Sequence, residues 1–233
     1  MATYLETHYS KNEFSESAYP QKLCDHFLDT YIRPHFDGNI EGLSMLDVGA
    51  GKGNHLVGFA RRGLKMYGLD KLKETNEVLM QFDVRECDLE KDPFPFESES
   101  FDIVFSKSVM EHVENADNFL AETKRVLKPG GLALLSCPDW GTQCHMYWDD
   151  YTHVKPWTRK GLQNAMKIHG FENVRALLWR QLPALWKSPS LEIVANILAL
   201  APESWKWKDK EESQHNEWIR FSKEKMLLGL GTK

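Results

Sequence analysis

Three glycines alternate with other residues directly after a short apolar stretch, in the sequence LDVGAGKGN at 46–54. Gly49, Gly51 and Gly53 come just before a run of residues that favours a helix. Glycine adopts backbone conformations that other residues rarely reach, and it lets another molecule approach the main chain closely. The pattern therefore predicts a ligand that lies against bare backbone at the end of a strand, where open α/β sheets bind their ligands.

Two acidic residues after later predicted strands favour a ligand that contains adenosine. Asp70 ends the second predicted strand about twenty residues beyond the first glycine, where an acid can accept hydrogen bonds from both ribose hydroxyls. Asp88 follows the third predicted strand, where its carboxylate could accept a hydrogen bond from an adenine amino group while Leu89 covers the ring. The alternative for Asp88 is a solvated turn residue in an acidic loop.

The glycine spacing discriminates between two adenosine ligands. A dinucleotide fingerprint reads G-x-G-x-x-G, but here the third glycine is one position early and Asn54 occupies the last position. Tyr151 and Lys155 have the spacing of a Tyr-x-x-x-Lys oxidoreductase pair, but Pro156 disfavours the helix that would align them. An NAD-dependent oxidoreductase is therefore less favoured than a protein that binds S-adenosylmethionine (SAM), which has no pyrophosphate.

Two segments contain groups that could remove a proton from an acceptor. His112 follows Glu111 in the sequence SVMEHV, and His153 lies in DWGTQCHMYWDDYTHVKPWT at 139–158. Histidine is the residue that most often serves as a general base. Both residues have a structural alternative, in which the imidazole holds a loop through hydrogen bonds. The second segment could build one face of an acceptor pocket from Tyr147, Trp148, Asp149, Asp150, Tyr151, His153 and Trp157.

Short apolar runs alternate with longer amphipathic ones after residue 43, which predicts strand and helix units around a mostly parallel sheet. The clearest helix has Phe119, Leu120 and Thr123 on one face, continues through Leu127 and Lys128 in its last turn, and is stopped by Pro129-Gly130-Gly131. The predicted strands are Met45–Val48, Lys65–Leu69, Phe82–Cys87, Phe101–Phe105, Leu132–Cys137 and Val174–Trp179, followed by a last strand within Glu224–Leu230.

The regions outside this core differ in character. Residues 4–36 contain Tyr4, Tyr9 and Phe14 among seven spaced aromatic residues, and they predict helices that precede the sheet. Residues 183–220 interrupt the alternation with three prolines, four tryptophans and an apolar helix over Leu191–Leu200. This insertion could be a lid, a dimer surface or an interfacial helix, and its helix is too short to span a bilayer.

Composition narrows the classes of partner and compartment. The chain has 233 residues, of which 42% are hydrophobic and 27% charged, and these values suit one compact domain with a sizeable core. The net charge of -5 comes without a basic block, which disfavours a nucleic-acid partner. Neither a secretory signal nor a membrane span is predicted, so we expect a cytoplasmic protein. Four scattered cysteines indicate reduced thiols and no metal site.

In order and spacing, the motifs resemble those of class I SAM-dependent methyltransferases, especially the small-molecule group of the UbiE/UbiG-like, methyltransferase type 11 kind. The segments that carry the resemblance are LDVGAGKGN, YGLD, ECDLEKDPFPFESESFDIVFSKSVMEHV and FLAETKRVLKPGGLALLSCPD. It covers roughly residues 43–180 and, more weakly, the final EKMLLGLGTK. It implies a Rossmann-like α/β fold with a mostly parallel seven-stranded sheet, helices on both faces, an N-terminal helical segment (1–42), an insertion (183–220) and a last strand within 221–233.

The resemblance also implies which residues hold the cofactor. The glycines would surround the methionine part of SAM, Asp70 the ribose, and Asp88 with Leu89 the adenine. Ser106 and Lys107 would line the methionine side, mainly through backbone. The complete set is Asp47, Gly49, Ala50, Gly51, Gly53, Asp70, Lys71, Asp88, Leu89, Ser106 and Lys107.

The expected function is transfer of a methyl group from SAM to a small-molecule acceptor, with a hydroxyl of a sugar or secondary metabolite ranked first. The sulfonium methyl is already activated, so the chemistry requires alignment and exclusion of water and no metal. His112 and His153 are the candidate bases, and Tyr147, Asp149, Asp150, His153 and Trp157 the candidate acceptor contacts. An alternative is a SAM-binding interaction protein without turnover. A homodimer through residues 183–220 is one of the possible assemblies.

Overall fold

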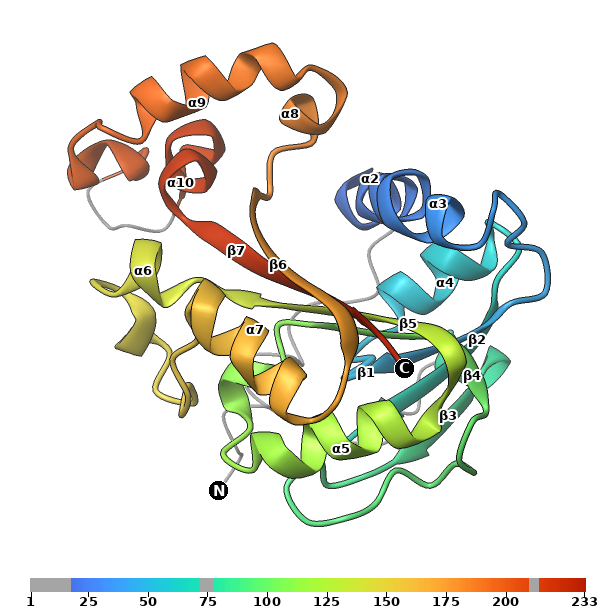
Figure 1. Ribbon diagram of the computed structural model, residues 1–233. Helices are drawn as coiled ribbons and strands as arrows, with labels where there is room; N and C mark the ends of the chain where they lie inside the picture. Colours follow the sequence, from blue (N-terminus) through green and yellow to red (C-terminus); the bar gives the residue numbers. More distant parts are fainter. Residues whose placement is uncertain (1–17, 72–77, 210–213) are drawn as a thin grey trace.

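The computed structural model describes residues 18–71, 78–209 and 214–233. A seven-stranded sheet with the strand order β3-β2-β1-β4-β5-β7-β6 forms its centre (Figure 1). Strands β1 to β5 pair in parallel, while β7 runs antiparallel to both β5 and β6. The strands are β1 Ser44–Val48, β2 Lys65–Asp70, β3 Asp83–Glu86, β4 Phe101–Lys107, β5 Leu127–Pro138, β6 Glu172–Arg180 and β7 Lys225–Thr232.

The predicted class I methyltransferase fold is confirmed, including the antiparallel last strand. Strands β1, β4 and β5 are almost continuously buried, because helices cover both faces of the sheet. Helices α5 (Ala116–Val126) and α7 (Arg159–Ile168) cover one face, and α2 (Ala18–Phe27) and α4 (Asn54–Ala60) cover the other. All parallel strands consequently end at one edge, where α4 begins.

The end of the helix before β5 was predicted two residues too late. Helix α5 stops at Val126, and Leu127 is already extended (φ -69°, ψ 139°) and pairs with Phe101. Pro129 disfavours the helical conformation for Lys128, so the chain leaves the helix before the proline. The Lys128 ammonium then lies 2.8 Å from an Asp102 carboxylate oxygen.

The N-terminal helical segment is confirmed from Ala18 onward. Helix α2 continues without a break into a π-helical stretch, η1 (Leu28–Ile32), and then into α3 (Arg33–His35). Their buried side chains include Leu23, Phe27 and Ile32, which pack on the sheet. The predictions for Tyr4, Tyr9 and Phe14 lie outside the described residues.

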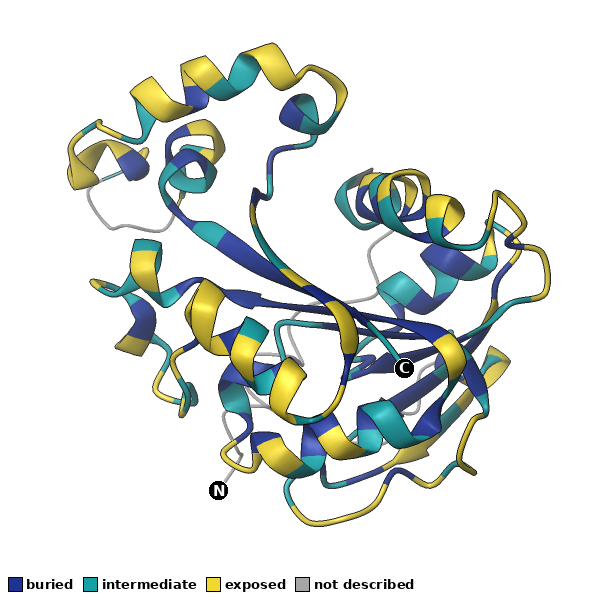
Figure 2. Cartoon of the chain, viewed as in Figure 1, coloured by how far each residue is buried: buried dark blue, intermediate teal, exposed yellow. Residues whose placement is uncertain are grey.

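The insertion consists of short helices around a small apolar cluster of Leu182, Leu185 and Ala195. The apolar helix predicted over Leu191–Leu200 is present as α9, over Glu192–Leu198, with much of its surface exposed (Figure 2). The other helices are α8 Pro183–Lys187, η5 Pro189–Leu191, η6 Glu203–Lys206 and α10 Glu217–Lys223. Among the described residues, no helix has both the length and the apolar character needed to cross a membrane.

Candidate cofactor and acceptor site

The glycine loop joins β1 to α4 at the carboxyl edge of the sheet. All three glycines have positive φ: 83° at Gly49, 51° at Gly51 and 83° at Gly53. A β-carbon at Gly49 would lie 2.2 Å from a Val109 methyl carbon, whereas one at Gly51 would meet nothing within 4 Å. Gly49 is therefore required by packing as well as conformation, and Gly51 has open space beside it that a ligand can occupy.

Asp47 contributes a buried carboxylate below this loop. The residue is 1% exposed, and one of its oxygens, Oδ2, has no hydrogen-bond partner among the described residues. Burial, and secondarily the nearby charge of Asp70, raises the pKa of Asp47 to about 8. An unpaired buried acceptor is costly unless a donor reaches it. This observation fits the ammonium group of SAM, so the residues present suit the cofactor implied by the resemblance.

His55, on the first turn of α4, was not among the predicted site residues. Its Nδ1 lies 4.0 Å from the Asp47 Oδ2. Burial, with a contribution from the charge of Lys107, lowers the pKa of His55 to about 3, so the ring is neutral. The sequence signal was the histidine directly after Gly53-Asn54.

Asp70 organises the loop as well as ending β2. Its Oδ2 accepts a hydrogen bond of 2.8 Å from the Gly51 amide, and the Gly49 and Ala50 amides both bond to the Leu69 carbonyl. The carboxylate therefore lies beside the glycine loop, as the cofactor assignment requires. Its contact with ribose hydroxyls stays a prediction.

Asp88 and Leu89 follow β3 at the same edge. Asp88 is within 3.7 Å of the Lys71 ammonium and 3.9 Å of that of Lys91, and its Oδ1 accepts from the Glu90 amide. Asp88 therefore holds a turn and also contacts two lysine side chains. Its recognition of adenine stays a prediction. Leu89 is buried against the core.

Ser106 and Lys107 form the end of β4. The Ser106 hydroxyl is fully buried and donates to the Val48 carbonyl at 2.8 Å, so it links β4 to β1. Burial lowers the pKa of Lys107, while the charge of Glu111 opposes this effect. Ser108 and Val109 follow, and Ser108 has a positive φ of 59°, which turns the chain toward the acceptor side.

Glu111, His112 and His153 converge beyond this turn, although they come from segments about forty residues apart. A Glu111 carboxylate oxygen and one ring nitrogen of each histidine all lie within 4.8 Å of one another. The short helix η3 (Met110–His112) carries the first two, and the Glu111 carbonyl accepts from the amides of Val154 and Lys155. The backbone therefore joins the predicted acceptor loop to η3.

Hydrogen bonds fix how the two imidazoles face this cluster. His112 Nδ1 is 3.2 Å from the Thr152 carbonyl oxygen, and His153 Nδ1 is 2.6 Å from the Tyr147 carbonyl oxygen. A carbonyl only accepts, so both Nδ1 atoms carry a proton, and Nε2 of each ring is the nitrogen left for another partner. Burial lowers the pKa of His112, which favours its neutral form.

The pKa values of the two carboxyl groups beside these rings shift in opposite directions. Glu111 is 1% exposed, its Oε2 has no hydrogen-bond partner among the described residues, and burial raises its pKa to about 8. Burial would also raise the pKa of Asp150, but hydrogen bonds from Thr152 and the two nearby histidines hold it below its usual value. Asp150 Oδ2 lies 3.9 Å from His153 Nε2.

Two of the predicted acceptor residues hold the loop together. Tyr147 and Trp157 are buried: the Tyr147 hydroxyl donates to the Lys155 carbonyl at 2.6 Å, and Trp157 Nε1 donates to the Met110 carbonyl at 3.1 Å. These bonds assign them a supporting role, and their contact with an acceptor stays a prediction. Asp149 is exposed at the end of η4 (Tyr147–Asp149), apart from the histidine pair that Asp150 faces.

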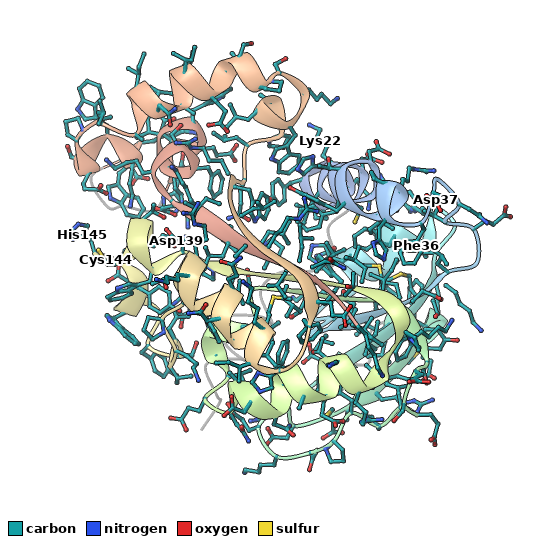
Figure 3. The ribbon with its side chains drawn as sticks, viewed as in Figure 1. Lys22, Phe36, Asp37, Asp139, Cys144 and His145 are labelled. Atoms are coloured by element: carbon teal, nitrogen blue, oxygen red, sulfur yellow. The ribbon has the colours of Figure 1, made fainter. Side chains whose placement is uncertain are left out.

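Cys144 and His145 mark the outer end of the same loop, beside α6 (Trp140–Gln143), as Figure 3 shows together with Asp139. Cys137 is fully buried in β5. The carboxylate and imidazole groups of Glu111, His112 and His153 are ligand types that divalent cations accept. The expectation that the chemistry requires no metal stays a prediction.

Comparison with known proteins agrees with this geometry. The family model of a methyltransferase domain matches residues 46–135. The ubiquinone biosynthesis O-methyltransferase of Maricaulis maris is 35% identical over 124 residues, which are 48% of this chain and 45% of that protein. The enzyme of the same name from Roseobacter denitrificans is 27% identical over 197 residues, 78% and 76% of the two chains. A SAM-dependent methyltransferase structure from Archaeoglobus fulgidus superposes with a TM-score of 0.61 at 18% identity, over 98% of both chains.

The fold and the domain match point to one class: residues 46–135 match the model of a methyltransferase domain, and the fold is that of class I SAM-dependent methyltransferases. Within this class its sequence is similar to O-methyltransferases of the UbiE/UbiG kind. The chain spans less than half the length of the Maricaulis maris relative. The acceptor and the activity of the whole protein are therefore treated as proposals.

Proposed function

We propose that this protein is a SAM-dependent O-methyltransferase that methylates a hydroxyl of a small molecule, with a sugar or a secondary metabolite as the preferred acceptor class. The observation that carries the proposal is the convergence of Glu111, His112 and His153 beyond β4. Nε2 of each histidine is left for another partner, and Glu111 Oε2 has no hydrogen-bond partner in the described part of the chain. A hydroxyl can both donate to a histidine Nε2 and accept from the Glu111 carboxyl, whereas a tertiary amine or a thioether has no hydrogen to donate.

His153 is the proposed base. Its Nδ1 is held by the Tyr147 carbonyl, which leaves Nε2 to take the proton from the acceptor oxygen. Asp150, 3.9 Å from that Nε2, stabilises the imidazolium that forms. When bound, SAM supplies the electrophilic methyl group. The protein's further contribution is to align the acceptor and exclude water through the loop fixed by Tyr147 and Trp157.

The test is turnover against a panel of hydroxyl acceptors from the carbohydrate, polyol and phenol classes, detected as S-adenosylhomocysteine (SAH) formation and a methylated product. His153→Gln should lower turnover by about 100-fold or more while leaving SAH affinity unchanged. His169→Gln is the matched control, because His169 is also partly buried and bonds a backbone carbonyl, but it lies at the end of α7. Equal turnover in His153→Gln and the wild type would remove His153 from the base role.

A second acceptor class follows from the relatives, whose names place their O-methylation in ubiquinone biosynthesis. The phenols in the panel represent this second acceptor class. If the protein methylates a phenol faster than every sugar, a phenol replaces the sugar as the proposed acceptor. The alternative without turnover predicts SAH binding with no product from any acceptor. The cytoplasmic location stays part of the proposal and is testable by cell fractionation.

A further inference from the structure

A groove of about 800 Å³ lies at the end of the sheet away from the glycine loop. Its walls come from the N-terminal helices, from α7 and from the strands β5, β6 and β7. Leu132, in its floor, precedes Ser136 by four residues along β5, and Ser136 pairs with Lys107 at the cofactor edge. Four strand residues span about 13 Å, so the groove is separate from the cofactor edge.

The lining combines an apolar floor with a cationic rim. Leu132, Val174 and Leu230 are buried in the floor, and the side chains of Lys167 and Arg175 are exposed at the rim. Neither cation makes an ion pair or hydrogen bond within the described ranges, and none of the lining residues that the structure describes carries a carboxylate. The chain as a whole has a net charge of -5, so a groove with only cations is a local departure from its overall charge.

Tyr31 adds an aromatic wall with a polar end. Its ring is partly buried beside Phe27, at a centroid distance of 5.7 Å, and burial raises the pKa of its hydroxyl while the charge of Arg175 lowers it. Tyr31 and Arg175 both line the groove. No hydrogen bond of the Tyr31 hydroxyl is found to another described residue, so this hydroxyl is available as a donor.

Irregular backbone builds both long walls of the groove. Thr30 and Tyr31 belong to the π-helical stretch η1, and π-helical turns occur often at functional sites. On the opposite wall, the register between β6 and β7 shifts between Glu172 and Arg175, and Asn173 has a positive φ of 50°. Such bulges redirect side chains and are frequent near binding sites. Each irregularity includes residues that line the groove.

We propose that this groove is a second ligand site, which binds a small molecule with a flat apolar body and one phosphate or carboxylate group. The volume lies within the range of small-molecule sites, about 300–1,000 Å³. The apolar body packs on Leu132, Val174 and the Tyr31 ring. The anionic group accepts hydrogen bonds from Arg175, Lys167 and the Tyr31 hydroxyl, and guanidinium groups suit phosphate and carboxylate oxygens.

The test is calorimetric titration of the full chain with phenyl phosphate, benzoate, phenol and inorganic phosphate, each in the presence and absence of saturating SAH. Phenyl phosphate or benzoate should bind saturably at one site, more tightly than phenol or phosphate alone, and SAH should not displace it. Arg175→Gln and Lys167→Gln should each weaken this binding by about tenfold. Lys160→Gln, at an exposed lysine on the same helix as Lys167, should leave it unchanged.

Absence of saturable binding for both aromatic anions at millimolar concentration would overturn the proposal. Equal affinity for phenol, displacement by SAH, or retention of full affinity in Arg175→Gln and Lys167→Gln would do the same. SAH binding is the separate readout for the cofactor site, so failure of the groove and failure of the methyltransferase proposal give different results.

Discussion

At the scale of single residues, the candidate site contains two buried carboxyl groups, those of Asp47 and Glu111. Each is 1% exposed, has an oxygen without a partner among the described residues, and has a pKa raised to about 8 by burial. Such groups reduce stability when ionised, because the lost hydration is not replaced. We predict that ligand groups complete their hydrogen bonding at the sheet edge.

The raised pKa of Glu111 predicts a pH-dependent effect of Glu111→Gln on stability. The folded-state pKa of about 8 exceeds the ordinary 4.5, so the stabilisation from proton binding is complete below pH 4.5 and is lost as the pH rises through 8. The variant should gain free energy of unfolding relative to the wild type, by about 1–3 kcal/mol between pH 5 and pH 9. Urea denaturation at both pH values measures this difference, and a pH-independent offset would contradict it.

Asp70 gives the second prediction at this scale. Asp70→Ala removes both the bond to the Gly51 amide and the proposed ribose contacts, so SAM affinity should fall by about 1–3 kcal/mol. Calorimetry with SAM measures the change, with Asp29→Ala on the exposed side of η1 as the control. Unchanged affinity in Asp70→Ala would exclude the ribose assignment.

At the element scale, the glycine loop and the turn after β4 are fitted to each other. Gly49→Ala would place a methyl group 2.2 Å from Val109 at a φ of 83°, so it should destabilise the fold by about 2–4 kcal/mol. Gly51→Ala carries only the backbone strain, about 1–2 kcal/mol, because its surroundings are open. Urea denaturation compares the two variants. Equal destabilisation would contradict the packing role of Gly49, and Val109→Ala should partly rescue Gly49→Ala.

The elements themselves were largely predictable, because buried parallel strands and capped amphipathic helices leave strong local patterns. The prediction that the glycines, Asp70 and Asp88 lie at one edge of the sheet holds for the same reason, because each follows or ends a parallel strand. The pairing of Glu111 with His153 was not predictable, since it depends on the Glu111 carbonyl accepting from Val154 and Lys155 across about forty residues. The buried state of Tyr147 and Trp157 likewise arises from long-range packing, which a sequence rich in aromatic residues does not reveal.

At the scale of the whole molecule, the insertion lies against the acceptor loop. The buried Lys206 pairs with Glu224 at 2.9 Å, and its ammonium lies 3.1 Å from the Met146 sulfur. On the outside of α9, the side chains of Ile193 and Ile197 are 68% and 64% exposed. An exposed apolar helix face of this kind marks a candidate interaction site, and a homodimer through this face stays one of the predicted alternatives.

Sedimentation velocity tests this assembly. A concentration-dependent dimer should form, and Ile197→Glu should shift it to monomer by placing a charge in the apolar contact. Ile168→Glu, at an 81% exposed residue of α7, is the matched control and should leave the dimer intact. A wild-type protein that stays monomeric at every concentration would contradict the predicted homodimer.

The central claim is that the glycine loop, Asp47 and Asp70 hold SAM. Calorimetric titration of the purified protein with SAM, SAH and NAD, beside Asp70→Ala, tests it most directly. We predict saturable binding of SAM and SAH at one site, no binding of NAD, and weaker binding of both sulfur ligands to the variant. Binding of NAD without either sulfur ligand, or no binding of any of the three, would contradict the account.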